Sequence, residues 1–489
     1  MTGDAVAGLL YRNAADGDRV FLASEDGTTV TYAEQLDRSQ RVAAGLRRRG
    51  ARAGDRVHVQ LGNCREFYDL WFATALSGTV LVPTNPQASA AELEHMLADA
   101  RPVLSLTDPA AVGALLAEGD ATGRSANDVS SAGDDGPRLA AIMYTSGTTS
   151  RAKGVMVTDA NYVAVGEAVA AHLAVTAADR WLIALPLFHA NAQYYCTMSA
   201  LATGASVALA PRFSASGWGR QARATNATLG SLFAAPVRMI LAQEPDPLDA
   251  DNRLRAVLFA QNVTDEQARE FERRFGTELL QLYGMTETVL PPTMNPPGAA
   301  RRWSSIGRPL PGLSIDLVRD DGEPATGPAG EMRIAGEPGV TVAAGYWNNP
   351  AATAGTFTPE GLRTGDLARR DPDGFYYFTD RSKDMIKRAG ENVSASEIES
   401  VAAQHPDVAE CAAIGVPDPV RDEAIWLIVV PRPGTAPAET DLLSWCRERL
   451  SPFKVPSAVE FAGTLPRTSV GKLRKSELRT LLASRAPQA

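Results

Sequence analysis

Lysine is scarce in this chain, and the first lysine falls where neighbouring residues could bind phosphate. Only six of the 48 basic residues are lysines, and none precedes Lys153. The six are Lys153, Lys383, Lys387, Lys454, Lys472 and Lys475. Because arginine is the usual cation here, a retained lysine indicates a position that needs a compact ammonium rather than a planar guanidinium. Codon bias in a GC-rich genome would also deplete lysine, so the surrounding motifs must decide.

Lys153 closes a run of small and hydroxyl-bearing residues. The run is Tyr144-Thr-Ser-Gly-Thr-Thr-Ser-Arg-Ala-Lys153-Gly154, and it follows a predicted strand at 140–144. Glycines let backbone amides approach anionic oxygens, hydroxyls donate hydrogen bonds to them, and an ammonium offsets their charge. The run therefore predicts a phosphate-binding loop, with a flexible surface loop as the alternative. It is not a Walker A loop, since Ala152 and Gly154 stand where that pattern needs a glycine and a hydroxyl residue.

Length and composition limit the class of protein. At 489 residues the chain is too long for one ordinary core, so two or three domains are expected. A hydrophobic content of 45% is typical of a globular protein, and the net charge of −9 argues against nucleic-acid binding. The four cysteines are far apart and indicate neither a zinc site nor a disulfide framework. With no signal-peptide pattern and no membrane span, we expect a cytoplasmic protein.

Helical and strand patterns alternate through the first half of the chain. Strands are predicted at 56–61, 79–83, 102–107 and 140–144, helices at 66–76 and 85–100, and a loop at 118–136. Thr31 and Glu34 fit a capping box that opens another helix, which runs toward Arg49. Such alternation predicts βα units with largely parallel sheets, and therefore an α/β fold.

The later part of the chain differs in its patterns. Frequent turn signals between 313 and 381 predict a β-rich subdomain. A small α+β unit is expected from about 384 to the end. It combines predicted helices at 396–404 and 440–450, strands at 409–416 and 424–431, and a terminal helix after Gly471.

Five segments resemble, in order, the signature blocks of the adenylate-forming superfamily, which includes acyl-CoA synthetases, peptide-synthetase adenylation domains and luciferases. They are the run at 144–154, Tyr283-Gly-Met-Thr-Glu-Thr288, Gly365-Asp366, 380–393 and 466–472. Segments 301–308, 421–425 and 453–457 look most like the crotonobetaine/carnitine–CoA ligase branch. The resemblance implies a large amino-terminal adenylate-forming domain, 1–382, and a mobile carboxy-terminal lid domain, 383–489.

The resemblance also implies which residues surround ATP. Joining a carboxylate to the α-phosphate brings two anions together, so a cation and a metal must offset their repulsion. Lys472 would bridge the two anions, and Glu287 would hold Mg²⁺, a hard cation that prefers carboxylate oxygens. Asp366 and Arg381 would bind the ribose, and Tyr283 would face adenine. The remaining nucleotide-binding candidates are Thr145, Ser146, Gly147, Thr148, Thr149, Lys153, Gly284, Met285 and Thr286.

The acyl side of the site is indicated by the block Pro186-Leu-Phe-His189. In the resembling family this block lines the acyl pocket and gates access for the thiol, although a lone histidine is more often structural. Phe259 and Gln261 replace small residues that are common at the family's pocket wall. The expected pocket residues are His189, Asn191, Gln193, Phe259 and Gln261, and the candidate catalytic residues are Lys472, Glu287, Thr145 and His189. The bulk of Phe259 and the polar side chains of the other pocket residues favour a small or polar carboxylate as the substrate.

The resemblance implies ATP-dependent acyl-CoA ligation in two steps. An acyl adenylate forms with release of pyrophosphate, and the thiol of coenzyme A then displaces AMP. Between the steps the lid would rotate about a hinge at Lys383 and open a CoA tunnel near Arg388 and Gly390. Three alternatives remain: transfer of the acyl group to a carrier protein or an amine, activation of another oxyanion such as nitrite, and a nucleotide-binding scaffold without turnover. Intact Lys472 and Glu287 argue against the scaffold.

Overall fold

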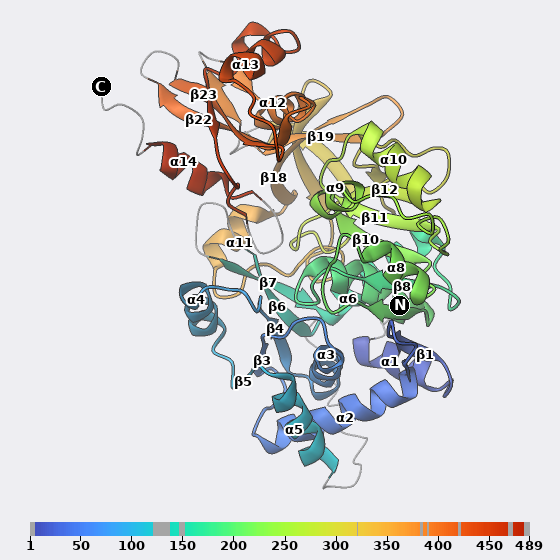
Figure 1. Ribbon diagram of the computed structural model, residues 1–489. Coiled ribbons are helices and arrows are strands. Elements are labelled where there is room, and N and C mark those ends of the chain that lie inside the picture. The colour runs from blue at the N-terminus through green and yellow to red at the C-terminus, as the bar shows by residue number, and fades with distance from the viewer. Residues whose placement is uncertain are drawn as a thin grey trace.

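The described residues of the computed structural model form four β-sheets with helices packed on them (Figure 1). The structure describes residues 5–120, 137–145, 152–319, 321–381, 385–388, 391–418, 422–467 and 473–483. The predicted α/β class is confirmed, because the two amino-terminal sheets are mainly parallel and a small α+β unit follows them. Among the helices of these residues, none combines the length and the apolar character that crossing a membrane requires.

The largest sheet is parallel in its centre and antiparallel at both edges. Its order is β14 (Arg308–Pro309), β13 (Thr293–Met294), β12 (Glu278–Tyr283), β11 (Ala256–Ala260), β10 (Leu229–Phe233), β8 (Arg180–Ile183), β9 (Ser206–Leu209), β1 (Val20–Ala23), β2 (Thr29–Thr31). Every pair from β12 to β1 is parallel. The central strands β10 and β11 are buried on both faces, as their continuous apolar sequences require.

Different helices cover the two faces of this sheet. The helices α8 (Trp218–Ala224), α9 (Ala234–Leu241) and α10 (Asp265–Phe275) pack on one face, where Trp218, Phe259 and Phe271 share a hydrophobic cluster. On the other face lie α6 (Asp159–Leu173), the π-helix η1 (Asn191–Thr197) and α7 (Met198–Thr203).

The second sheet carries the end of the predicted phosphate loop. Its order is β5 (Leu104–Leu106), β3 (Arg56–Val59), β4 (Val80–Pro83), β6 (Leu139–Thr145), β7 (Lys153–Thr158). Only the pair β6–β7 is antiparallel. The helices near it are α1 (Val6–Ala14), α2 (Tyr32–Arg48), α3 (Arg65–Ser77), α4 (Ala90–Ala100) and α5 (Pro109–Asp120).

Most of the predicted helix and strand boundaries in this region agree with the structure, and two do not. The capping box of α2 is confirmed, since Glu34 N donates to Thr31 Oγ1 at 3.1 Å and Thr31 N donates to Glu34 Oε2 at 2.8 Å. Helix α4 begins later than the predicted residue 85 because Ser89 and Glu92 form a second capping box. Helix α5 was not predicted and extends to Asp120, within the segment expected to be a loop.

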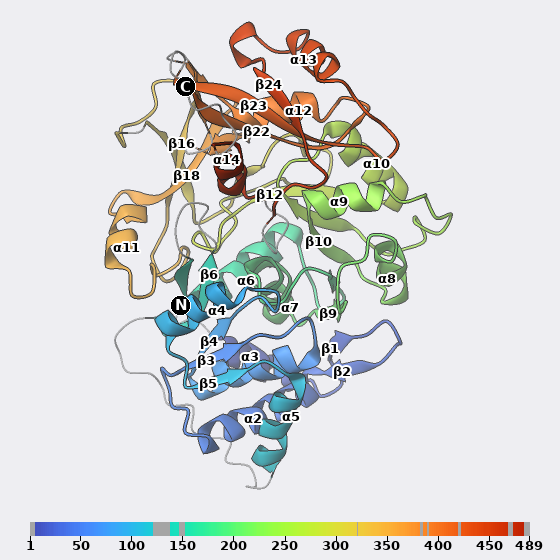
Figure 2. The same ribbon diagram turned by 60° about the vertical axis from the view of Figure 1, so that its left-hand side comes forward.

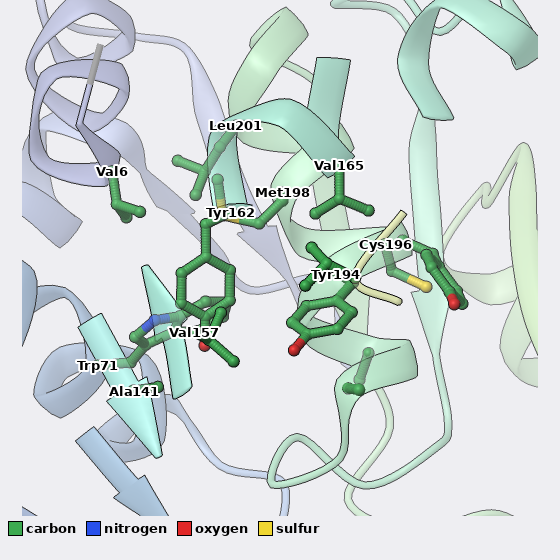
Figure 3. Close-up of a cluster of buried hydrophobic side chains, with 14 of the residues drawn as sticks. Val6, Trp71, Ala141, Val157, Tyr162, Val165, Tyr194, Cys196, Met198 and Leu201 are labelled. Carbon is green, nitrogen blue, oxygen red and sulfur yellow. The ribbon is translucent and has the colours of Figure 1, made fainter. Parts of the chain in front are cut away.

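The two sheets meet through α6 (Figure 3). Trp71 of α3 packs against the Tyr162 ring with centroids 5.4 Å apart, and Tyr162 packs against Tyr194 at 5.8 Å. Both tyrosines are completely buried, and Ala141 and Val157 of the second sheet join the same core. This continuous core packs the two sheets against one another.

A third sheet and the carboxy-terminal unit complete the structure. The third sheet is antiparallel and contains β15 (Ser314–Val318), β16 (Ala329–Ala335), β18 (Gly361–Arg370), β17 (Phe357–Thr358) and β19 (Tyr376–Arg381), with α11 (Pro350–Thr356) beside it. The β-rich prediction for 313–381 is thereby confirmed.

The carboxy-terminal unit lies at the end of the protein opposite to α2 and α5 (Figure 2). Its sheet has the order β21 (Glu391–Val393), β20 (Ile386–Arg388), β23 (Asp422–Pro431), β22 (Val408–Asp418), with β24 (Ala458–Phe461) beside β23. Its helices are α12 (Ala395–Ala402), α13 (Glu439–Arg447), the 3₁₀ turn η3 (Pro452–Lys454) and α14 (Lys475–Ala483). Ile398, Leu427 and Leu442 belong to a hydrophobic core of this unit. The domain boundary at 382/383 stays a prediction.

Candidate active site

Four neighbouring parallel strands end at the edge where most of the predicted acyl and adenine residues lie. His189 follows β8, Phe233 ends β10, Gln261 follows β11, and Tyr283 ends β12. In sheets of this kind the carboxyl ends of the strands open toward the ligand-binding side. The topology therefore gathers side chains that are far apart in the sequence.

The predicted ribose and adenine residues are in direct contact. Tyr283 Oη donates a hydrogen bond of 2.6 Å to Asp366 Oδ2, and both side chains are buried. Asp366 lies on β18, where its backbone N donates to Thr364 Oγ1 at 3.1 Å. Arg381, at the end of β19, is the strand partner of Asp366 in the backbone register. The structure thus brings the three residues predicted for the nucleoside to one place.

A tyrosine that the sequence analysis did not select connects the predicted metal and phosphate residues. Tyr346 Oη donates to Glu287 Oε1 at 2.9 Å, and Lys153 Nζ lies 4.4 Å from the centroid of the Tyr346 ring. Glu287 is buried, with 6% of its surface exposed. Burial, assisted by the neighbouring Glu287 carboxylate, raises the pKa of Tyr346 well above its ordinary value. The phenol therefore stays protonated and keeps donating at physiological pH.

The two ends of the phosphate loop are fixed by the second sheet. Thr145 ends β6 and is paired in register with Lys153, which begins β7. The hydroxyl of Thr145 donates to Lys153 O at 3.4 Å. The other predicted loop residues, Ser146, Gly147, Thr148 and Thr149, lie outside the described residues. The same is true of Lys383, Gly390 and Lys472.

The segment before Glu287 is packed closely against η1. A Cβ atom at Gly284 would lie 2.4 Å from the hydroxyl oxygen of Tyr195, so a larger residue there would force the tyrosine to move. Met285 N donates to Thr288 Oγ1 at 3.0 Å. Thr286 O accepts a hydrogen bond of 3.4 Å from the Tyr194 hydroxyl. These contacts hold the backbone that carries Glu287.

His189, which precedes η1, and Asn191, the first residue of η1, face the end of β10. The His189 ring packs edge-on against Phe233, with centroids 5.7 Å apart. Asn191 Oδ1 accepts a hydrogen bond of 2.8 Å from the Ser231 hydroxyl. The Asn191 side chain is 3% exposed, and its Nδ2 has no hydrogen-bond partner among the described residues. A buried donor without a partner is costly, and π-helical turns often mark functional sites.

Two of the predicted acyl-pocket residues are buried and contact other residues of the protein interior. Gln193 is fully buried, accepts from Tyr162 Oη at 2.5 Å and donates to Leu187 O at 2.7 Å. Phe259 pairs in register with Leu232, and both belong to the core beneath α8, α9 and α10. Because successive strand residues alternate faces, Phe259 points away from the Ser231 face. We therefore leave Gln193 and Phe259 out of the proposed pocket.

Gln261 keeps its place at the strand edge but has an unusual backbone. Its φ is 73°, in the left-handed region that favours glycine. Its carbonyl accepts from Gln281 Nε2 at 2.8 Å, and the same Nε2 donates to Asn262 Oδ1 at 2.8 Å. The amide of Gln281 thereby holds the turn after β11 in this conformation.

Several cationic side chains of the carboxy-terminal unit form contacts within that unit. Arg388 Nη1 donates to Val455 O at 2.7 Å and to Phe453 O at 3.2 Å. Lys454 and Lys475 form ion pairs of 2.7 and 2.8 Å with Glu397 and Glu399, respectively. These two lysines contact α12, so a retained lysine does not by itself mark a phosphate site.

The donor set at Glu287 fits Mg²⁺ that arrives with a nucleotide. Among the described residues, no three His, Cys, Asp or Glu side chains cluster as metal ligands. Proteins commonly hold Mg²⁺ with one or two carboxylates together with substrate phosphates and water. The single buried carboxylate of Glu287, close to the phosphate-loop lysine, corresponds to that arrangement.

Known proteins resemble this chain over almost its whole length. The pattern of the AMP-binding enzymes matches residues 10–347, and that of the AMP-binding enzyme C-terminal domain matches residues 397–472. A crotonobetaine/carnitine–CoA ligase from Salmonella agona is 34% identical over 497 residues, which cover 95% of this chain and 96% of the relative.

Two solved structures of one protein also resemble this chain. ATP-bound MatB from Rhodopseudomonas palustris superposes with a TM-score of 0.86 at 30% identity, covering 98% of this chain and 99% of MatB. Apo MatB from the same organism gives a TM-score of 0.73 at 29% identity, with the same coverage.

Proposed function

Because the chain belongs to the AMP-binding enzyme family, we propose that it is an AMP-forming acyl-CoA ligase that activates a small or polar carboxylate. The matches confirm the resemblance to the adenylate-forming superfamily. The observation that carries the proposal is the contact of Tyr346 with both Lys153 and Glu287, which unites the proposed phosphate and metal residues.

The described residues suit adenylation. A carboxylate oxygen would attack the α-phosphorus of ATP, the bond to the bridging oxygen would break, and pyrophosphate would leave with both electrons of that bond. Lys153 would offset the charge on the departing phosphates, and the Tyr283–Asp366 pair would hold the nucleoside. Mg²⁺, held by Glu287, would supply further charge compensation. Lys472 is proposed to bridge the carboxylate and the α-phosphate.

We propose that the carboxy-terminal unit takes part in the ATP-dependent step. The chain superposes better on ATP-bound MatB than on apo MatB. In the second step the thiol of coenzyme A would attack the acyl carbonyl and AMP would leave. Lid rotation at Lys383 and a CoA tunnel near Arg388 and Gly390 remain proposals, as does a cytoplasmic location.

The acyl pocket is proposed to lie between η1 and the ends of β10 and β11. Its residues would be His189, Asn191 and Gln261. The unpartnered amide hydrogens of Asn191 favour an acyl group that carries a hydrogen-bond acceptor, such as a hydroxyl or carbonyl oxygen. A carrier protein or an amine is the alternative acceptor in place of coenzyme A.

A panel of carboxylates, measured by pyrophosphate release, tests the proposed function. Release should require ATP, Mg²⁺ and one class of short or oxygen-bearing acid. Addition of coenzyme A should raise the steady-state rate of pyrophosphate release and yield an acyl thioester and AMP. A burst of pyrophosphate that coenzyme A does not accelerate would instead support the carrier-protein or amine alternative. No carboxylate-dependent release with any acid would contradict the proposed function.

A further inference from the structure

Tyr346 is fixed in place by a backbone segment that joins two parts of the proposed site. Ala343 N donates to Glu287 O at 2.9 Å, Ala344 N donates to Met156 O at 3.0 Å, and Trp347 N donates to Gly154 O at 2.7 Å. The segment therefore runs from the Glu287 loop along β7, where Lys153 begins the strand.

The glycine before the tyrosine makes this path possible. Gly345 has a φ of 122°, and a Cβ there would lie 2.7 Å from Thr353 Cγ2. The Tyr346 ring is 5% exposed and packs edge-on against Phe357, with centroids 5.7 Å apart. The ring thus has little freedom to move.

The ring contacts two opposite charges at different places. Lys153 Nζ lies over its face, and Glu287 accepts a hydrogen bond from its hydroxyl at the ring edge. Both residues are described, and no ion pair joins them. A direct ion pair would neutralise both groups, whereas a ring face and a phenol hold each in place without removing its charge.

We propose that Tyr346 is a positioning residue that holds the Glu287 carboxylate for Mg²⁺ and the Lys153 ammonium for the nucleotide phosphates. The inference rests on the proposed function and adds a residue to it. Tyr346 acts through two independent parts of one side chain. Its hydroxyl orients the carboxylate, and its ring face orients the ammonium.

Two substitutions separate these parts. Y346F removes the hydroxyl and keeps the ring, so affinity for ATP in the presence of Mg²⁺ should fall about tenfold, the scale of a hydrogen bond to a charged group. Affinity for ATP without Mg²⁺ should change by less than about twofold, because the Lys153 contact remains. Y346L removes both parts and should also weaken Mg²⁺-free ATP binding, by about fivefold.

Isothermal titration calorimetry of ATP binding, without carboxylate, measures these affinities independently of turnover. Y377F is the matched control, since Tyr377 Oη donates to the carboxylate of Asp371 at 3.0 Å outside the proposed site. It should bind ATP as the wild type does. Equal affinities of Y346F and wild type for ATP with Mg²⁺ would overturn the inference, and so would an equal loss in Y377F. Wild type that fails to bind ATP at all would contradict the proposed function instead.

Discussion

The buried amide of Asn191 is proposed to select the acyl substrate. Its oxygen is fixed by the Ser231 hydroxyl, which leaves the nitrogen in one orientation. The nitrogen has no partner among the described residues, although the side chain is buried. A site built to donate a hydrogen bond discriminates strongly against an analogue that lacks the acceptor, because the donor is then left unpaired.

Substitution of Asn191 tests this selection. Wild type should prefer an acid with a hydroxyl or oxo group over the same acid without it by at least about tenfold in kcat/KM. Asn191→Leu, which is similar in size, should bring that ratio close to one and leave the KM for ATP unchanged. The measurement is kcat/KM for each acid of a matched pair, with the two acids in competition. The unfolding temperature of each protein is the control for correct folding. A ratio that survives the substitution would show that Asn191 does not contact the acyl group.

At the level of residues, the sequence identified motif positions better than side-chain directions. Asp366 and Tyr283 lie together as their blocks implied. Phe259 was placed at the pocket because it stands where the resembling family has small residues, but the alternation of side chains along β11 directs it into the core beneath α8, α9 and α10. Tyr346 was missed because an aromatic residue after a glycine carries no signal until its spatial neighbours are known.

Helix α4 contacts both ends of the predicted phosphate loop and also the carboxy-terminal unit. Glu92, His95 and Asp99 lie on one face of the helix because they are spaced by three and four residues. Glu92 Oε1 is 3.3 Å from Arg474 Nη2, and His95 Nε2 donates to Ala152 O at 3.0 Å. Asp99 Oδ2 accepts from the Tyr144 hydroxyl at 2.6 Å. One helix therefore contacts both ends of the strand–loop–strand unit and a residue that follows the Lys472 block.

Loss of the Glu92–Arg474 pair should affect the two half-reactions unequally. The arrangement of the carboxy-terminal unit is proposed to serve adenylation, so Arg474→Ala should slow that step and spare thioester formation. Because both side chains are over one third exposed, the pair is screened, and the effect should be no more than about fivefold and decrease with added salt.

The comparison is pyrophosphate release against the conversion of a supplied acyl adenylate to the thioester. Arg449→Ala is the control, since Arg449 pairs with Glu448 at 2.8 Å inside the carboxy-terminal unit. A larger loss in thioester formation than in adenylation would contradict the proposed arrangement.

At the level of elements, the sequence predicted those helices and strands that interactions between residues close in the chain determine. The capping box at Thr31 and Glu34, the β-rich segment and the strand pair β22–β23 were all expected. Helix α5 was missed because its Ala- and Leu-rich sequence has little amphipathic character and leads directly into the predicted loop. The start of α4 was misjudged because a capping serine, not the hydrophobic pattern, sets it.

The proposed site is a property of the whole molecule, since three sheets contribute to it. Lys153 and Thr145 come from the second sheet, Tyr283 from the largest sheet, and Asp366 from the third. The continuous core around Tyr162 and Tyr194 fixes the first two sheets relative to one another. No spacing along the sequence could have shown this convergence, because it depends on the crossing order of the strands.

The central claim is that a carboxylate is activated as an acyl adenylate, and the path of one oxygen atom tests it most directly. If the carboxylate attacks the α-phosphorus, one of its oxygens must remain on the phosphate when the thiol displaces AMP. Turnover of an accepted acid labelled with a heavy oxygen isotope in its carboxylate, followed by mass spectrometry of the nucleotide, measures this transfer. We expect AMP carrying one heavy oxygen. Unlabelled AMP, or ADP as the nucleotide product, would contradict the account.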